Sequence, residues 1–381
     1  MLGLVVALVA LDEIVVNVSN RAELAAALSS AKPGHTILIA PGEYQGNLWA
    51  SNLLGTKDRK ITIAGSDKSN PPRIRGGSTG IQLSQVSHLE IRDLSISGIS
   101  ANGINIDDGG SITSPSHHIT LKRITVGDLP QGNHDGIKLS GVDDFAVEEC
   151  KVSRWGGSGI DMVGCHRGAI KSCEFREGAD SGVQAKGGSS EIRIESCLFV
   201  NGGQRGVNIG GSTGAAFFRP SLQTMGNMRY EAKQISVNGC MFVGGGAAVA
   251  FVGVDGADVS FNTMVNPSRW VMRILQETTD RDFVPCQYGQ FTDNLVVFTS
   301  SNWSAGGVNV GPNTRPTTFR FARNFWFCAD SPDVSRPTLP MPEQDGVYGV
   351  NPQISMGTDN RVEVLASSSA KQVGAHAWKR S

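Results

Sequence analysis

One pattern is written three times between residues 142 and 211. Each copy has a short alternating run, a Cys, a Gly-containing turn and a second run of the form Gly-apolar-polar-apolar. The copies read VDDFAVEECKVSRWGGSGIDMVG, CHRGAIKSCEFREGADSGVQAKGG and SSEIRIESCLFVNGGQRGVNIGG. Cys150, Cys173 and Cys197 mark one position, at spacings of 23 and 24 residues (173−150 and 197−173). This period is too short for a pair of helices and is typical of one turn of a solenoid.

The alternation within each run predicts strands, because successive side chains of a strand point to opposite faces. Stacked turns would pair each strand with its equivalent in the next coil as a parallel sheet. The sequence therefore predicts an all-β fold, a single-stranded right-handed parallel β-helix. Residues 20–31 (NRAELAAALSSA) predict the one clear helix, with Ser19 or Asn20 as its cap, and we expect it to cover the N-terminal end of the coils.

We expect one β-helix domain over residues 1–381, because a solenoid grows by adding coils. Residues 212–232 interrupt the repeat and predict a loop inserted beside the second-run sheet. Residues 331–349 are rich in Pro and are expected outside the sheets. Residues 1–10 (MLGLVVALVA) suggest a signal-peptide remnant and an extracytoplasmic (periplasmic or secreted) location, although a basic start is missing. The alternative interpretation is a first strand or a frayed terminus.

The seven Cys residues do not predict disulfides or a metal site. Four of them occupy one position in the repeat, and Asn262, Asn294 and Asn324 take that position in later coils. A column of stacked small or amide side chains explains this pattern, whereas a zinc site needs converging ligands. We expect Asp93 and Arg123 to hold the same position in earlier coils.

Net charge and hydropathy limit the kinds of binding partner that we expect. The net charge is −1 and the chain has no run of Lys or Arg, which argues against nucleic acid. It also has no stretch of about 20 apolar residues that would span a membrane. We expect a monomer that binds an acidic polysaccharide.

Polar residues gather on the outward side of the second-run strands, and this face is the candidate site. The column expected there is Asn105, Lys138, Asp161, Gln184, Asn208, Ala250, Arg273 and Asn309. Neighbouring positions add His134, Asp135, Lys186 and Arg205, and the insertion adds Arg219, Arg229 and Tyr230. These residues predict a locally basic groove suited to an extended acidic polymer. The competing interpretation is a solvated face of hydrogen-bonded ladders and weak ion pairs.

The coils resemble those of the right-handed β-helix polysaccharide lyases. The stretch SGVQAKGGSSEIRIESCLFVNGGQRGVNIGG is similar to the alginate lyase and chondroitinase B family, and NHDGIKLSG followed by GGSGIDMVG is similar to the calcium and lysine pectate lyases. The chain lacks the Arg-His-Gly stretch of the first family, whose position falls near Gly210 and Gly211. The paired acids of the second family are replaced by Gly157 and Ser158. Because only Asp161 remains, no cofactor is expected, and calcium would have an incomplete set of ligands.

The resemblance implies cleavage of a uronate polymer by β-elimination, with Lys186 as the base. That reaction also needs neutralisation of the substrate carboxylate and a proton for the leaving oxygen. Lys138, Arg205 and Asn208 are expected to neutralise the carboxylate, and neighbouring cations to depress the pKa of Lys186. Tyr230 or His134 would protonate the leaving oxygen. The residues expected to bind substrate are Asp135, Asp161, Gln184, Asn208, Arg219 and Arg273.

Three other functions remain open from the sequence. A uronate C5 epimerase begins with the same proton abstraction. A glycoside hydrolase needs two carboxylates, for which Asp107, Asp135 and Asp161 are available. A non-catalytic glycan-binding or structural β-helix would use the same coils.

Overall fold

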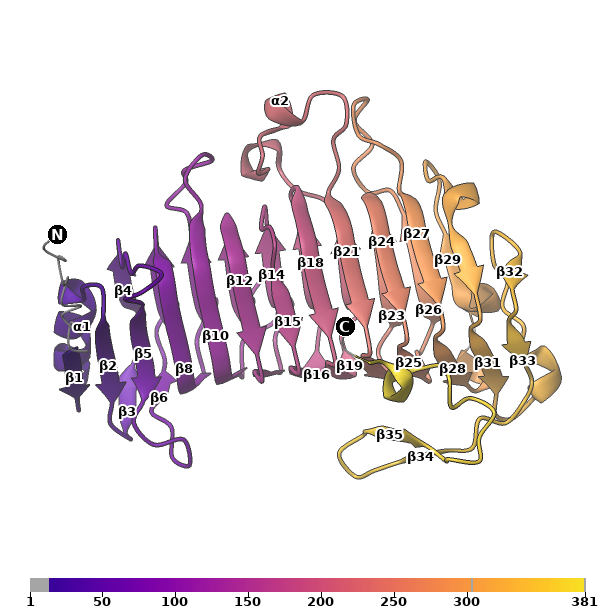
Figure 1. The fold of residues 1–381 in the computed structure, drawn as a ribbon, viewed down its shortest axis with the longest axis horizontal. Coiled ribbons are helices and arrows are strands. Elements are labelled where there is room, and N and C mark those ends of the chain that lie inside the picture. Colours follow the sequence, from indigo (N-terminus) through magenta and orange to yellow (C-terminus); the bar gives the residue numbers. More distant parts are fainter. Residues whose placement is uncertain (1–13, 303, 380–381) are drawn as a thin grey trace, which may run out of the picture.

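Short alternating runs form the coils of a right-handed parallel β-helix (Figure 1). The structure is a computed structural model that describes residues 14–302 and 304–379. The suggested signal-peptide remnant at residues 1–10 lies outside the described residues. In the described part of the chain, no helix is long and apolar enough to cross a membrane.

Three ladders of parallel strands form the walls of the coil. The site wall consists of β4 (Leu48–Ser51), β7 (Ile81–Ser84), β9 (Ile104–Asp107), β11 (Ile137–Ser140), β14 (Ser158–Val163), β17 (Ser181–Lys186), β20 (Arg205–Gly210), β23 (Ala247–Val252), β26 (Trp270–Leu275) and β29 (Val308–Val310).

The second wall consists of β1 (Ile14–Val18), β2 (His35–Ile39), β5 (Ile61–Gly65), β8 (Ser87–Ser97), β10 (Ser116–Gly127), β12 (Val142–Glu148), β15 (Ala169–Lys171), β18 (Ser189–Glu195), β21 (Ala232–Asn238), β24 (Val254–Ser260), β27 (Gln287–Thr292), β30 (Arg320–Ala322) and β32 (Glu343–Gln344).

The third wall consists of β3 (Glu43–Gln45), β6 (Arg73–Arg75), β13 (Lys151–Ser153), β16 (Glu174–Gly178), β19 (Leu198–Gly202), β22 (Met241–Val243), β25 (Thr263–Val265), β28 (Leu295–Phe298), β31 (Phe325–Cys328) and β33 (Val347–Tyr348). The long strands β8 and β10 continue into this wall, because their later residues pair with β6 and β13.

Stacks of identical or similar side chains fill the space between the walls. The rings of Phe175, Phe199 and Phe242 lie parallel in three successive coils, with centroids 4.7 and 4.6 Å apart. Ile160 and Val183 are fully buried in the equivalent inward positions of the site wall. Because each inward residue meets its equivalent one coil away, the repeat in the sequence becomes a continuous core.

The Cys and Asn residues form the expected ladder inside one turn. All seven Cys residues are free and buried. The backbone N–H of Cys240 donates to Asn262 Oδ1 at 2.9 Å, and the N–H of Asn262 donates to Asn294 Oδ1 at the same distance.

In the earlier coils, the ladder position was predicted one residue too early, at Asp93 and Arg123. Lys122 pairs with Glu148 and Thr125 with Lys151, so Ile124 rather than Arg123 is level with Cys150. Leu94 pairs with Ile124 in turn. Asp93 and Arg123 instead have positive φ and form an ion pair on the outside of the turn.

The predicted helix is present as α1 (Arg21–Ser30). Asn20 is its cap, because its side chain accepts a hydrogen bond from the N–H of Glu23. Leu24 and Leu28 are buried against the first coils, so the helix covers the N-terminal end of the core (Figure 1).

The insertion extends from Gly211 to Glu231, since Ala232 already pairs within β21. It contains a short 3₁₀ turn, η1 (Ala215–Phe217), and one turn of helix, α2 (Leu222–Met225). Figure 1 shows it as the long excursion that carries α2 and leads into β21. The other 3₁₀ turns are η2 (Ser300–Asn302), η3 (Ser304–Gly307), η4 (Pro316–Thr318), η5 (Pro332–Val334) and η6 (Ala375–Ala377).

The expectation that residues 331–349 lie outside the sheets is wrong for their second half. The strands β32 and β33 come from this segment and pair in parallel with β30 and β31. Pro cannot donate a ladder hydrogen bond, but the prolines all precede the two strands. After this last partial coil, the hairpin β34 (Ile354–Met356) and β35 (Val362–Val364) starts a tail that runs back along the coils (Figure 1).

Candidate functional site

One column of outward-facing residues runs the length of the site wall. The register pairs its members in the order Trp49, Gln82, Asn105, Lys138, Asp161, Gln184, Asn208, Ala250, Arg273 and Asn309. Neighbours in the column are about 4.8 Å apart, the spacing of paired strands. Alternation in the sequence predicts this column from Asn105 onward, and the register confirms it.

A pocket of ≈ 500 Å³ lies over the middle of the column. On the sheet side the pocket is lined by Asn105, Asp107, Lys138, Asp161 and Lys186. On the insertion side it is lined by Thr213, Phe217 and Arg219. Although Asp161 points away from the coil interior, only 1% of the residue is exposed. The insertion therefore converts part of an open sheet face into a pocket with buried charges.

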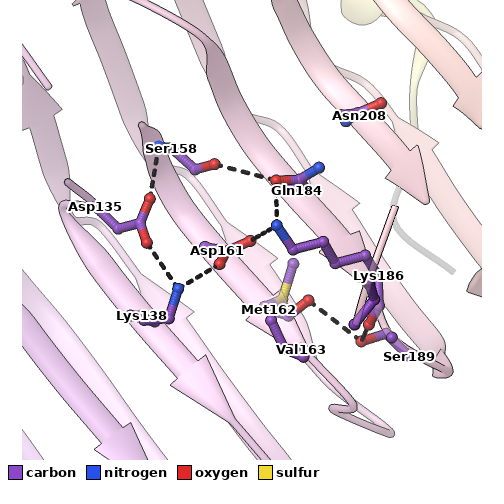
Figure 2. Close-up of polar contacts among 12 residues, drawn as sticks. Asp135, Lys138, Ser158, Asp161, Met162, Val163, Gln184, Lys186, Ser189 and Asn208 are labelled. Carbon is purple, nitrogen blue, oxygen red and sulfur yellow. Dashed lines mark hydrogen bonds and ion pairs between the residues drawn. The ribbon is translucent and has the colours of Figure 1, made fainter. Parts of the chain in front are cut away.

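Asp161 lies between two lysines at the base of this pocket (Figure 2). Lys138 Nζ is 2.7 Å from Asp161 Oδ2 and 3.0 Å from Asp135 Oδ2. On the other side, Lys186 Nζ is 3.4 Å from Asp161 Oδ1 and donates to Gln184 Oε1 at 3.1 Å. Three successive strands, β11, β14 and β17, thus contribute alternating positive and negative charges.

Ser158 closes these contacts into a ring. Its backbone N–H donates to Asp135 Oδ1 at 2.7 Å, and its hydroxyl donates to Gln184 Oε1 at 3.4 Å (Figure 2). Asp161 Oδ1 accepts no hydrogen bond from the residues that the structure describes. This oxygen is buried and lies 3.4 Å from Lys186 Nζ, so the partly exposed Lys186 ammonium is the member of the ring with capacity to bind a ligand.

The two lysines have different electrostatic surroundings. Burial lowers the pKa of Lys138, but the carboxylates of Asp161 and Asp135 raise it by more, so the net direction is upward. Burial raises the pKa of Asp135, and the nearby Asp161 charge raises it further. Lys138 is consequently a permanent cation near neutral pH and cannot serve as a base.

The expectation that cations surround Lys186 is wrong. Its charged contact is the Asp161 carboxylate, and its side chain is 20% exposed to the pocket. Lys186 makes one ion pair and one hydrogen bond, whereas Lys138 is held between two carboxylates. Of the two lysines, Lys186 is the less constrained.

The pocket is not basic, contrary to the sequence prediction. Its lining contains three carboxylates, Asp107, Asp108 and Asp161, and three cations, Lys138, Lys186 and Arg219. These formal charges cancel. Alternation predicts which residues face outward, but it does not indicate Asp108, because Asp108 follows β9 in a turn rather than in the column.

Arg219 holds the insertion in place. Its guanidinium Nη2 donates to Asp108 Oδ1 at 2.9 Å, and Nη1 donates to the carbonyl of Phe217 at 2.9 Å. Asp108 is 111 residues away in the sequence and is almost fully buried. Arg219 therefore positions the wall of the pocket, although it was predicted to bind substrate.

Glu231 is a second anchor that the sequence did not suggest. It is fully buried and accepts hydrogen bonds from the N–H groups of Gly187 and Thr213, both at 3.0 Å. It also accepts from the hydroxyls of Thr213 at 2.7 Å and Thr278 at 2.6 Å. The insertion is thus fixed to the site wall directly beside Lys186.

Three predicted residues, Arg205, Asn208 and Arg273, lie on later coils of the site wall and do not line the pocket. Arg205 donates to Asn208 Oδ1 at 3.1 Å and pairs with Glu277 at 2.6 Å. Arg273 donates to Asn309 at 3.0 Å, and its guanidinium lies over the ring of Trp270. Because Arg205 does not line the pocket, its predicted role beside Lys186 is not supported.

The two predicted proton donors are also outside the pocket. Tyr230 lines a separate cavity of ≈ 390 Å³ on the other side of Arg219, together with His166 and Asp143. Burial raises the pKa of Tyr230. His134 precedes β11 and is absent from the lining of the pocket, whereas its neighbour Asn133 is part of it.

The pocket residues do not fit a calcium site. Calcium takes six to eight oxygen ligands, and the carboxylates of Asp135 and Asp161 converge on the ammonium of Lys138 instead. Within the described residues, the only three side chains whose metal-ligating atoms come together are His88, His117 and His118, which lie outside the pocket.

Comparisons with known proteins agree with this fold. The family model described as right handed beta helix region matches residues 79–264. No curated protein sequence matches the chain.

Similar solved structures include an alginate lyase from Paenibacillus sp. strain FPU-7, with TM-score 0.53 and 17% identity over 77% of this chain and 99% of that chain. They also include the pectate lyase Pel9A, with TM-score 0.51 and 14% identity over 92% and 89%. A third is the GH136 lacto-N-biosidase from Eubacterium ramulus, with TM-score 0.55 and 14% identity over 88% and 67%. The resemblance to β-helix polysaccharide lyases is therefore confirmed at the level of the fold, and this protein is a right-handed parallel β-helix.

Proposed function

We propose that this protein is a polysaccharide lyase that cleaves an acidic, uronate-containing polymer by β-elimination. The observation that carries the proposal is the placement of Lys186 and Lys138 on either side of the Asp161 carboxylate, in a pocket on the outward column. A polymer that lies along the column would present successive sugars to successive coils. The lyases among the similar structures share this fold. An extracytoplasmic location belongs to the same proposal.

Lys186 is the base in this proposal. In its neutral form it takes the C5 proton of a uronate, the electron pair forms the C4–C5 double bond, and the C4–O bond breaks. Lys138 remains charged because its two carboxylates hold its proton, so it provides the fixed positive charge for the substrate carboxylate.

The leaving oxygen receives its proton from Lys186 in the same scheme. Neither Tyr230 nor His134 lines the pocket, so the ammonium formed by C5 deprotonation is the donor close to the reacting atoms. One side chain then carries the proton from C5 to O4. This requires both groups to lie on the same face of the sugar ring, which makes the elimination syn.

The test is a screen of alginate, pectate, chondroitin and heparinoid substrates for new ultraviolet absorbance, because elimination leaves a conjugated double bond. The Lys186→Ala variant should lose at least about 99% of the activity if the lysine is the base. The control is Lys151→Ala, an exposed lysine on the third wall. Full activity of Lys186→Ala on a substrate that the unaltered protein cleaves would reject the assignment.

A glycoside hydrolase is the second candidate, because two carboxylates, Asp107 and Asp161, line the same pocket. The GH136 lacto-N-biosidase among the similar structures supports it. Hydrolysis would release reducing ends without ultraviolet absorbance. A C5 epimerase would exchange the C5 proton with deuterated solvent without chain cleavage, and a non-catalytic module would bind glycan without any of these products.

A further inference from the structure

Three histidines converge on the second wall, at the start of β8 and β10. Their ligating nitrogens all lie within 4.8 Å of one another. Nδ1 of His117 is 2.9 Å from Nδ1 of His118. His88 and His117 are partly buried and His118 is exposed. The chain has seven histidines in total, so nearly half of them meet at this one point.

The coil register brings these residues together. Ser87 pairs with His117 and Leu89 with Ile119, so His88 is level with His118 one coil away. Both residues have positive φ, 46° for His88 and 56° for His118, and the same local turn directs their side chains alike. Their rings stack with centroids 4.4 Å apart at 27°. The adjacent His117 adds a third ring nearly perpendicular to both.

The ring spacings fit shared coordination of one ion. With metal–nitrogen bonds of about 2.05 Å and about 1.15 Å from nitrogen to ring centre, two imidazoles on one metal have centroids about 4.5 to 5.2 Å apart, for ligand angles between 90° and 109°. Of the three observed separations, 5.1 Å lies inside this range, and 4.4 and 5.4 Å lie within about 0.2 Å of its ends. We propose that His88, His117 and His118 form a binding site for a divalent transition metal such as Zn²⁺, with solvent completing the coordination.

The charges around the cluster favour a cation. The next coil places Asp143 opposite His117. Asp143 and the adjacent Asp144 are bound by Arg167, and Asp143 also by His166, so they contribute negative potential without displacing the histidines. Imidazole nitrogen suits zinc, copper and nickel, whereas magnesium and calcium prefer oxygen ligands.

This site is separate from the pocket and does not depend on the proposed function. Ser116, His117 and His118 are the first residues of β10, directly after the loop at residues 109–115. The hydroxyl of Ser116 donates to the carbonyl of Asp107, at the end of β9, at 2.8 Å. A bound ion would therefore join two coils at the edge of the loop that reaches the pocket.

The test is calorimetric titration of the full chain, freed of metal by a chelator, with ZnCl₂. One equivalent of Zn²⁺ should bind, and His118→Ala should weaken binding by at least about tenfold, because one of three ligands is lost. His35→Ala is the matched control, since His35 lies on the same wall outside the cluster. Equal binding by the two variants, or no binding by the unaltered protein, would overturn the proposal in favour of a simple stack of imidazoles joined by hydrogen bonds.

Co²⁺ substitution separates this site from the seven cysteines. Thiolate ligands give intense near-ultraviolet charge-transfer bands, whereas an all-nitrogen and water site gives only weak visible bands. We expect only the weak bands, and they should disappear in His118→Ala, whose circular dichroism should remain unchanged because His118 is exposed. Thiolate bands would show that the metal binds cysteine instead.

Discussion

Lys138 and Asp161 lie directly opposite each other on adjacent strands, and their charged atoms are 2.7 Å apart. Lys186 reaches the same carboxylate from the next coil. Asp161 thus links two lysines that are 48 residues apart in the sequence (186−138). The coil period is what makes this possible, because it converts a spacing of two repeats into two steps across a sheet.

Asp161→Asn should lower the stability of the protein. The substitution keeps the shape but takes away the negative charge that Lys138 and Lys186 share, while Asp135 still pairs with Lys138. We expect a loss of about 1.5–3 kcal/mol in the free energy of unfolding, the range for hydrogen bonds to charged groups. Urea unfolding monitored by circular dichroism measures it. The exposed Asp58→Asn is the control, and an equal effect of the two substitutions would contradict the linking role of Asp161.

Lys138→Met should make stability depend on pH. Without the ammonium, the buried carboxylates of Asp135 and Asp161 repel each other, so the pKa of Asp135, already raised by burial and by Asp161, should rise further. The folded protein then binds a proton more tightly than the unfolded chain. The associated stabilisation is present at low pH and is lost as the pH rises through the raised pKa.

The variant should therefore be less stable at about pH 8 than at about pH 5, each compared with the unaltered protein, by about 1–3 kcal/mol. Urea unfolding at both pH values checks this, with Lys151→Met as the control. A destabilisation that is the same at both pH values would show that the two carboxylates do not interact in the way the ring implies.

Glu231→Gln should loosen the insertion. A glutamine amide would place a donor beside the N–H groups of Gly187 and Thr213, so at least one buried hydrogen bond is replaced by a repulsive contact. We expect trypsin to cleave after Arg229 several-fold faster, while the coils remain resistant. Gel electrophoresis of a digestion time course measures this. Glu191→Gln is the matched control on the exposed face of β18, and identical digestion would exclude Glu231 as an anchor.

Periodicity explains why most of the fold was predictable. Alternation gives each side chain a direction, and the spacing of Cys150, Cys173 and Cys197 gives the register, so the column containing Lys138 and Asp161 follows from local rules. The register is less certain where the repeat lacks its marker. In the coils before Cys150, Arg123 was assigned to the inward position that the apolar residue Ile124 occupies, a shift of one residue.

Contacts of the insertion were not predictable, because its residues follow no period. Nothing in the sequence links Arg219 to Asp108, which is 111 residues away. Tyr230 and Arg219 were expected to lie over one groove, yet only Arg219 lines the pocket over the column. Tyr230 lines the second cavity, which Arg219 also borders, because Tyr230 leads into β21 of the second wall. The predicted charge of the pocket was wrong for a similar reason: Asp108 lies in a turn, where the repeat does not show that it reaches the pocket.

Trp49 should bind the far end of a long substrate. It occupies the outward column four register steps from Asp161, a distance of about 19 Å, which is several sugar units. The residue is 63% exposed, and an aromatic face packs well against the apolar face of a pyranose. If the polymer follows the column, Trp49→Ala should raise KM for polymeric substrate by about three- to tenfold, and leave KM for a disaccharide or trisaccharide unchanged.

Initial rates over a series of oligosaccharide lengths measure this effect of Trp49→Ala, with Tyr288→Ala, an exposed aromatic on the second wall, as the control. A KM that does not depend on Trp49 at any length would mean that the chain leaves the column before it reaches β4, and that the sugars bound at the pocket run across the coils rather than along them.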